Sequence, residues 1–82
     1  MHSIHAYDDA IYFLNLAAEH RTASDEAERS DYPTACALLA RADAALARAV
    51  SHYEMCSGSF TDRSRLRALI AAESDALARA RR

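Results

Sequence analysis

The segment from Tyr32 to Cys56 places an apolar residue at alternating steps of three and four, which is the heptad pattern of a helix that packs lengthwise against other helices. Every second position of this seam is small, and the positions between them are bulky. In order, the seam residues are Tyr32, Ala35, Leu39, Ala42, Leu46, Ala49, Tyr53 and Cys56. Small side chains let a second helix approach closely, while bulky ones fill the space beside it. The pattern therefore predicts a helix that lies against other helices.

The composition extends this helical prediction to the whole chain. There is one glycine and one proline in 82 residues, and alanine, the best helix former, is abundant. We expect an all-α fold in one domain, residues 1–82: an antiparallel three-helix bundle, or a helical hairpin with a third helix. The expected helices span roughly 4–29, 32–57 and 62–80. Because alanine contributes little to a core, we also expect the chain to self-associate.

Capping residues suggest where these helices begin and end. Asp31 is suited to cap the second helix, and Pro33 fits its first turn. Gly58 is expected to end that helix in a left-handed conformation. Phe60 is expected to act as a hydrophobic staple just ahead of a cap at Thr61-Asp62.

Polar residues interrupt the apolar sides of the first and third helices. After Ala18 the apolar side of the first helix stops, which leaves three alternatives. The first is that the helix frays near His20, and the second is that its second half projects into water. The third is that a new helix starts, with a cap at 22–25. In the third helix, Glu73 falls inside the apolar stripe, where a neighbouring helix must supply a polar partner.

The two cysteines bear on both redox state and association. On one continuous helix Cys36 and Cys56 are about 30 Å apart, too far for a disulfide within the chain. We expect reduced thiols. An antiparallel dimer of the second helix, centred near Ala45 and Leu46, would instead bring Cys36 near Cys56 of the other copy and allow cross-linking.

Few features of the sequence indicate chemistry. His2, His5 and Asp9 have a spacing that can place metal ligands on one side of a helix, but only two are histidines, and we expect no metal. His52 and Cys56 are one turn apart, and we interpret the cysteine as structural. No nucleophile elbow or phosphate-binding loop is present. We therefore predict that the protein is not an enzyme and uses no cofactor.

Charge and hydropathy narrow the location and the partners. The net charge is -2, which gives no indication of a polyanion partner. The first residues do not form a signal peptide, and no apolar run approaches the roughly 20 residues that span a bilayer. We expect a cytoplasmic protein that does not bind membranes.

An aromatic and aliphatic set on the first helix is the strongest candidate for a contact surface. Tyr12, Phe13 and Leu16 widen the apolar arc of this helix beyond what two neighbouring helices cover. Either this helix is the most buried element, or the three residues form an exposed patch for a partner or a second copy. Tyr32 and Tyr53 are further candidate anchors if the seam faces outward. The leading hypothesis is an adaptor, inhibitor or small chaperone that binds another protein or a peptide helix, and that forms a homodimer.

The alternative hypothesis is a helical protein associated with nucleic acid through the arginines of the third helix. Its candidate basic patch comprises Arg63, Arg65, Arg67, Arg79, Arg81 and Arg82. Acidic neighbours dilute this patch and no aromatic residues for base stacking lie between the arginines. We therefore rank it below the protein-binding hypothesis.

The run Tyr32-x-x-Ala35-x-x-Leu38-Leu39-x-x-Ala42 resembles the second helix of tetratricopeptide repeats. It is even more similar to the three-helix microtubule-interacting-and-transport domain, whose third helix ends with a Leu-x-Arg-Ala pattern that Leu77-Ala78-Arg79-Ala80 matches. The resemblance covers about half of the chain. It implies a domain that binds short helical or extended peptides in a groove flanked by the second and third helices.

Overall fold

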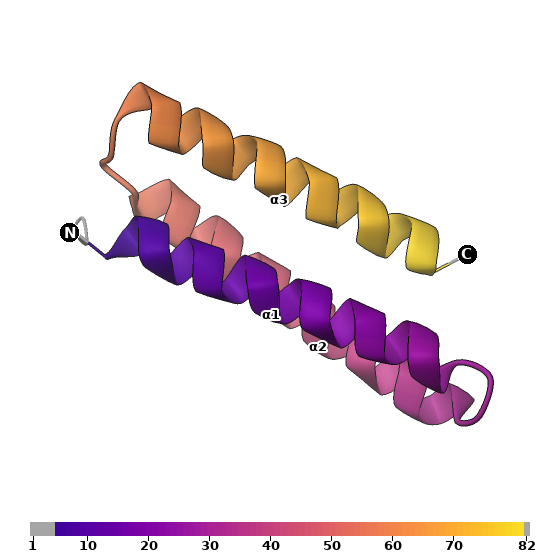
Figure 1. Ribbon diagram of the computed structural model, residues 1–82. Helices are drawn as coiled ribbons and strands as arrows, with labels where there is room; N and C mark the ends of the chain where they lie inside the picture. Colours follow the sequence, from indigo (N-terminus) through magenta and orange to yellow (C-terminus); the bar gives the residue numbers. More distant parts are fainter. Residues whose placement is uncertain (1–4, 82) are drawn as a thin grey trace.

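The computed structural model describes residues 5–81, which form three helices in an up-down-up order (Figure 1). Helix α1 spans Ala6–Ala27, α2 spans Tyr32–Met55 and α3 spans Phe60–Ala80. Helices α1 and α2 form a tight hairpin, and α3 lies along one side of it. The all-α fold predicted from the sequence is therefore confirmed.

Alanine lines the interface between α1 and α2. The small seam positions of α2 are buried, and they meet small residues of α1, so the two backbones run close together. The buried alanines are Ala6, Ala10, Ala17, Ala35, Ala42, Ala45 and Ala49. The bulky seam residues Leu39, Leu46 and Tyr53 are only half-buried, because they lie beside this interface, and Tyr32 is 67% exposed. The seam of α2 is thus covered by α1 of the same chain, and an α2–α2 dimer in the predicted register would have to displace α1.

Helix α3 is attached by fewer and larger side chains. Leu66 and Leu77 are buried against the hairpin, and Leu14 is the large buried residue that α1 contributes. Between the two leucines of α3, the carboxylate of Glu73 accepts hydrogen bonds from Arg21 Nε at 2.7 Å and from its terminal nitrogen at 3.2 Å. The polar partner that the sequence required for Glu73 is therefore Arg21 of α1. The carboxylate raises the pKa of Arg21 above its ordinary value.

The second half of α1 is continuous helix to Ala27, so it neither frays near His20 nor restarts. Its apolar stripe stops because two neighbouring helices accept polar side chains there. Arg21 faces α3, and Ser24 is buried against α2, where its hydroxyl donates a 2.8 Å hydrogen bond to the carbonyl oxygen of Ala35. These two contacts replace apolar packing along the distal part of the hairpin.

The helix boundaries confirm one cap and correct two. Asp31 caps α2, since its carboxylate accepts the backbone N–H of Thr34 at 3.1 Å. Gly58 has no positive φ, because the extended backbone of Cys56 already turns the chain after α2. The capping residue of α3 is Ser59, and Phe60 begins the helix. Phe60 is 85% exposed, so it does not act as a staple.

Candidate functional site

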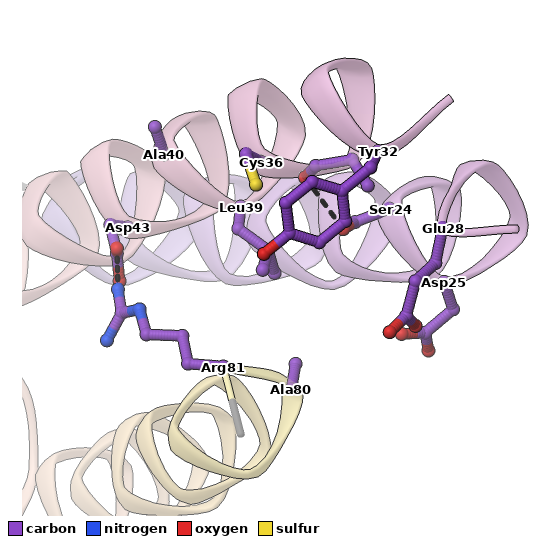
Figure 2. A pocket seen from close by; sticks show the side chains of 11 residues that line it. Ser24, Asp25, Glu28, Tyr32, Cys36, Leu39, Ala40, Asp43, Ala80 and Arg81 are labelled. Carbon is purple, nitrogen blue, oxygen red and sulfur yellow. Dashed lines mark hydrogen bonds and ion pairs between the residues drawn. The ribbon is translucent and has the colours of Figure 1, made fainter. Parts of the chain in front are cut away.

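The hairpin extends beyond the end of α3 and leaves a pocket there. Arg81, just after α3, pairs with Asp43 of α2. Helix α2 begins at Tyr32, so about 16 Å of the helix lies beyond that level. We call the resulting cavity the tip pocket; Figure 2 shows it from close by.

The tip pocket has a volume of about 320 Å³ and is open to solvent on one side. All three helices line it: the last turns of α1, the first three turns of α2 and the end of α3. Its lining residues are Ser24, Asp25, Glu28, Tyr32, Ala35, Cys36, Leu39, Ala40, Asp43, Ala80 and Arg81. The alanines and Leu39 give the pocket an apolar floor, and polar groups stand around it.

Negative charge dominates the rim of the tip pocket. The carboxylates of Asp25 and Glu28 stand together on one wall (Figure 2), and Asp43 on the far side is paired with Arg81. The C-terminal end of α3, where helix carbonyls give a partial negative charge, also lies at this rim. The arrangement therefore favours a cationic group.

Tyr32 and Cys36 complete the wall formed by α2. The two residues are one turn apart, and a hydrogen bond with the Cys36 thiol raises the pKa of the Tyr32 hydroxyl. Tyr32 presents its ring to the pocket, with most of the side chain exposed. An exposed aromatic face beside carboxylates suits a cation with an apolar stem.

A second hollow, the outer groove, lies between α1 and α2 on the side away from α3. It has a volume of about 290 Å³ and is lined by Phe13, Leu16, His20, Arg41, Ala44, Ala45 and Arg48. The flank of α1 that faces α3 carries different residues, among them Ile11 and Ala18, which line a hollow between those two helices. The outer groove is thus a separate face of the hairpin.

Aromatic contacts organise one end of the outer groove. The ring of Phe13 stacks on His52 at a centroid distance of 5.4 Å and a 5° angle, and the guanidinium of Arg48 lies 5.5 Å from the same ring. The rings of Tyr12 and Phe13 pack edge to face with a centroid distance of 5.1 Å, and 61% of the Tyr12 surface is exposed. Nδ1 of His52 lies 3.9 Å from the carboxylate of Asp9. The set Tyr12, Phe13 and Leu16, singled out in the sequence, therefore lies together on this face.

The arginines of α3 contact the hairpin individually. Arg63 lies 4.9 Å from the ring of Tyr53 and donates to the carbonyl oxygen of Cys56. Arg67 donates to the hydroxyl of Tyr53 at 3.4 Å and lowers the pKa of that hydroxyl. Tyr53 is thus in contact with two arginines of α3 and does not line the outer groove.

The remaining arginines of the candidate basic patch are spread over the surface. A hydrogen bond with Tyr7 raises the pKa of Arg65, Arg81 is paired with Asp43, and Arg79 is exposed. Arg82 lies outside the described residues. Arg65 and Arg81 therefore contact different helices of the hairpin, α1 and α2.

The structure locates the described residues of the candidate metal site and the two cysteines. His2 lies outside the described residues, His5 precedes α1, and Asp9 lies near His52. Among residues 5–81, no three His, Cys, Asp or Glu side chains converge in a way that would hold a metal ion. Cys56 is buried and Cys36 is exposed at the tip pocket. None of the described helices is long and apolar enough to cross a membrane.

Compared with known proteins, the chain matches no family model, and it is significantly similar to neither a curated protein nor a solved structure. The resemblance to microtubule-interacting-and-transport domains therefore stays a prediction.

Sequence reasoning included two residues of the tip pocket among its candidates, Tyr32 as a contact residue and Arg81 as part of the basic patch, but it missed the acidic residues and Cys36. Asp25, Glu28, Cys36 and Asp43 belong to three separate stretches of sequence that the α1–α2 hairpin brings together, and the end of α3 completes the cavity. One signal was available. Tyr32 and Cys36 are one helical turn apart on the same flank of α2, which placed an aromatic ring beside an exposed thiol.

Proposed function

We propose that the protein is a non-enzymatic interaction module that binds a segment of another protein at the tip pocket. The segment would insert an arginine or lysine side chain, and its apolar stem would pack on Tyr32 and Leu39. The observation that carries this proposal is the pocket itself, an apolar floor surrounded by carboxylates from two helices.

The size of the pocket fits one long side chain. Its volume of about 320 Å³ corresponds to roughly ten water molecules at 30 Å³ each, which is enough for the seven heavy atoms of an arginine side chain. The pocket is also open along one side, so the backbone of the bound segment would stay at the surface. Residues beside the inserted side chain would contact the first turns of α2.

Electrostatics support a basic anchor. Of the four charged side chains in the lining, Arg81 is already paired with Asp43, which leaves Asp25 and Glu28 exposed to an incoming cation. Desolvation by the bound segment would strengthen this attraction. The ring of Tyr32 adds a cation–π contact of the kind that is worth about 0.5 to 1 kcal/mol at exposed sites.

Selection from a random-peptide library would test the proposal. We expect enriched peptides to carry an arginine or lysine flanked by apolar residues, and to shift the amide resonances of residues 32–43 and 80–81. Glu28→Gln combined with Asp25→Asn should weaken binding at least about tenfold, in line with the loss of charge-assisted contacts.

Two exposed tyrosines provide the matched control. Tyr32→Ala should weaken peptide binding severalfold, whereas Tyr12→Ala should leave the affinity of single peptides unchanged, because Tyr12 is similarly exposed but does not line the tip pocket. If enriched peptides lack a basic residue, or if Tyr12→Ala weakens binding as much as Tyr32→Ala, the tip pocket is not the binding site.

A further inference from the structure

The outer face of the hairpin has a divided charge pattern. On α2, Arg41 and Arg48 are exposed beside the outer groove. The acids of α2 lie on its other flank: Asp43 pairs with Arg81, and Glu54 follows three turns later on the same side as Asp43. The outward side of α2 is therefore basic.

Helix α1 provides the opposite charge. Glu19 and Glu26 are exposed and line a hollow formed by α1 residues alone. Arg21, the arginine within α1, is turned to Glu73 of α3. Between the acidic edge and the basic edge lies the apolar strip formed by Tyr12, Phe13 and Leu16. The face thus carries acid, apolar and basic bands that run along the hairpin.

Such a face is complementary to itself in only one of two symmetric arrangements. In the first arrangement, the two-fold axis lies in the interface and is perpendicular to the helices. It would place α2 on α2 of the second copy, so that arginine faces arginine. A two-fold axis parallel to the helices places α1 of each copy on α2 of the other, with acid facing base. Rotation about this axis keeps each residue at its own height along the hairpin. Glu19 would then meet Arg41 of the second copy, because both lie at the level of Leu16 and His20.

We propose that the outer face binds a second copy of this chain and forms a dimer whose two-fold axis runs parallel to α1 and α2. The interface consists of the outer groove, with Leu16 at its centre, Tyr12 beside Arg48 of the other copy, and Glu19 opposite Arg41 of the other copy. This inference does not depend on the function proposed for the tip pocket.

The direction of the axis has a consequence for the tip pocket. Because the axis runs along the helices, both tip pockets lie at the same end of the dimer. The outer groove and the tip pocket share none of their lining residues, so dimerisation leaves both pockets open. A partner with two suitable segments would gain affinity from the linked second contact.

Sedimentation equilibrium of the full chain tests the dimer directly. We expect the wild type to approach twice the 9.0 kDa monomer mass as its concentration rises. Leu16→Glu should sediment as a helical monomer, with helicity checked by circular dichroism. Leu69→Glu on α3, whose leucine is 42% exposed, is the matched control and should still dimerise. A wild type that stays monomeric at every concentration overturns the proposal.

A charge swap then tests the arrangement. Glu19→Arg and Arg41→Glu should each weaken association roughly tenfold, because each places two like-charge contacts in the dimer. A 1:1 mixture of the two variants should restore wild-type association, since in the heterodimer every contact again joins opposite charges. If the mixture associates no better than the single variants, the parallel axis is wrong and the proposal fails.

Discussion

The two interfaces of the molecule differ in how they hold helices together. Between α1 and α2, small side chains let two long helices run in continuous close contact. Between α3 and the hairpin, the buried attachment comprises two leucines and one ion pair. An alanine interface distributes its stabilisation over many weak contacts, whereas the α3 interface concentrates it in a few large ones. Single substitutions should therefore affect the two interfaces differently.

Leu66→Ala should have the largest effect and should act on α3 first. Leu66 is fully buried, and truncating such a leucine costs about 2 to 5 kcal/mol. Because the hairpin has its own interface, we expect hydrogen exchange to accelerate in α3 more than in α1 and α2. Leu69→Ala, on the more exposed side of α3, is the control and should change exchange little. Equal loss of protection in all three helices would show that the hairpin depends on α3.

Ala42→Leu tests the other interface. Ala42 is fully buried where α1 and α2 approach, so added methylene groups would force the helices apart at a cost of about 1 to 3 kcal/mol. We expect the midpoint of thermal unfolding to fall, with protection lost in α1 and α2 together. Ala47→Leu on the exposed side of α2 keeps the same change of side chain without the crowding, and it should unfold like the wild type.

The seam of α2 is the feature that made the packing of the hairpin predictable from the sequence. Alternating small and bulky residues predicted a helix covered by another helix, and α1 covers it. Two predictions about helix ends failed. At Gly58, a local rule for ending helices was applied to a position at which Cys56 had already turned the chain. At Phe60, the helix had already begun, because Ser59 is its cap. Ser24 and Arg21 made the second half of α1 look solvent-exposed in the sequence, although both have partners on neighbouring helices. A polar residue on a helix suggests solvent, unless the partner that satisfies it is known.

The tip pocket was less predictable than the fold. Its existence depends on where the end of α3 meets α2, and at that level Arg81 pairs with Asp43 and Leu77 is buried. Periodicity assigns residues to the faces of a helix but does not fix the relative height of two helices. The outer groove was easier, because Tyr12, Phe13 and Leu16 are close in sequence and share one helix.

Glu73→Gln refines the comparison at the α3 interface. The substitution keeps the shape and one acceptor for Arg21 but removes the charge, so we expect a loss of about 1 to 2 kcal/mol, the difference between charged and neutral hydrogen bonds. A double-mutant cycle with Arg21→Gln measures the coupling between the two residues in urea unfolding. A coupling energy near zero would mean that the Arg21–Glu73 pair does not contribute to the attachment of α3.

Asp31→Ala should have the smallest effect, confined to the start of α2 and dependent on pH. The hydroxyl and backbone N–H of Thr34 donate to the Asp31 carboxylate and hold its pKa below the ordinary value. A carboxyl whose pKa is lower in the folded state stabilises the fold above its unfolded pKa of about 3.9, and this contribution is lost as the pH falls through the folded pKa. The unfolding midpoint of the variant should therefore lie below that of the wild type at neutral pH, and the two should converge in acid. Asp75→Ala, an exposed position on α3, controls for the loss of one negative charge. A difference that persists unchanged at the lowest pH would show that the cap acts through the shape of the turn and that its charge contributes nothing.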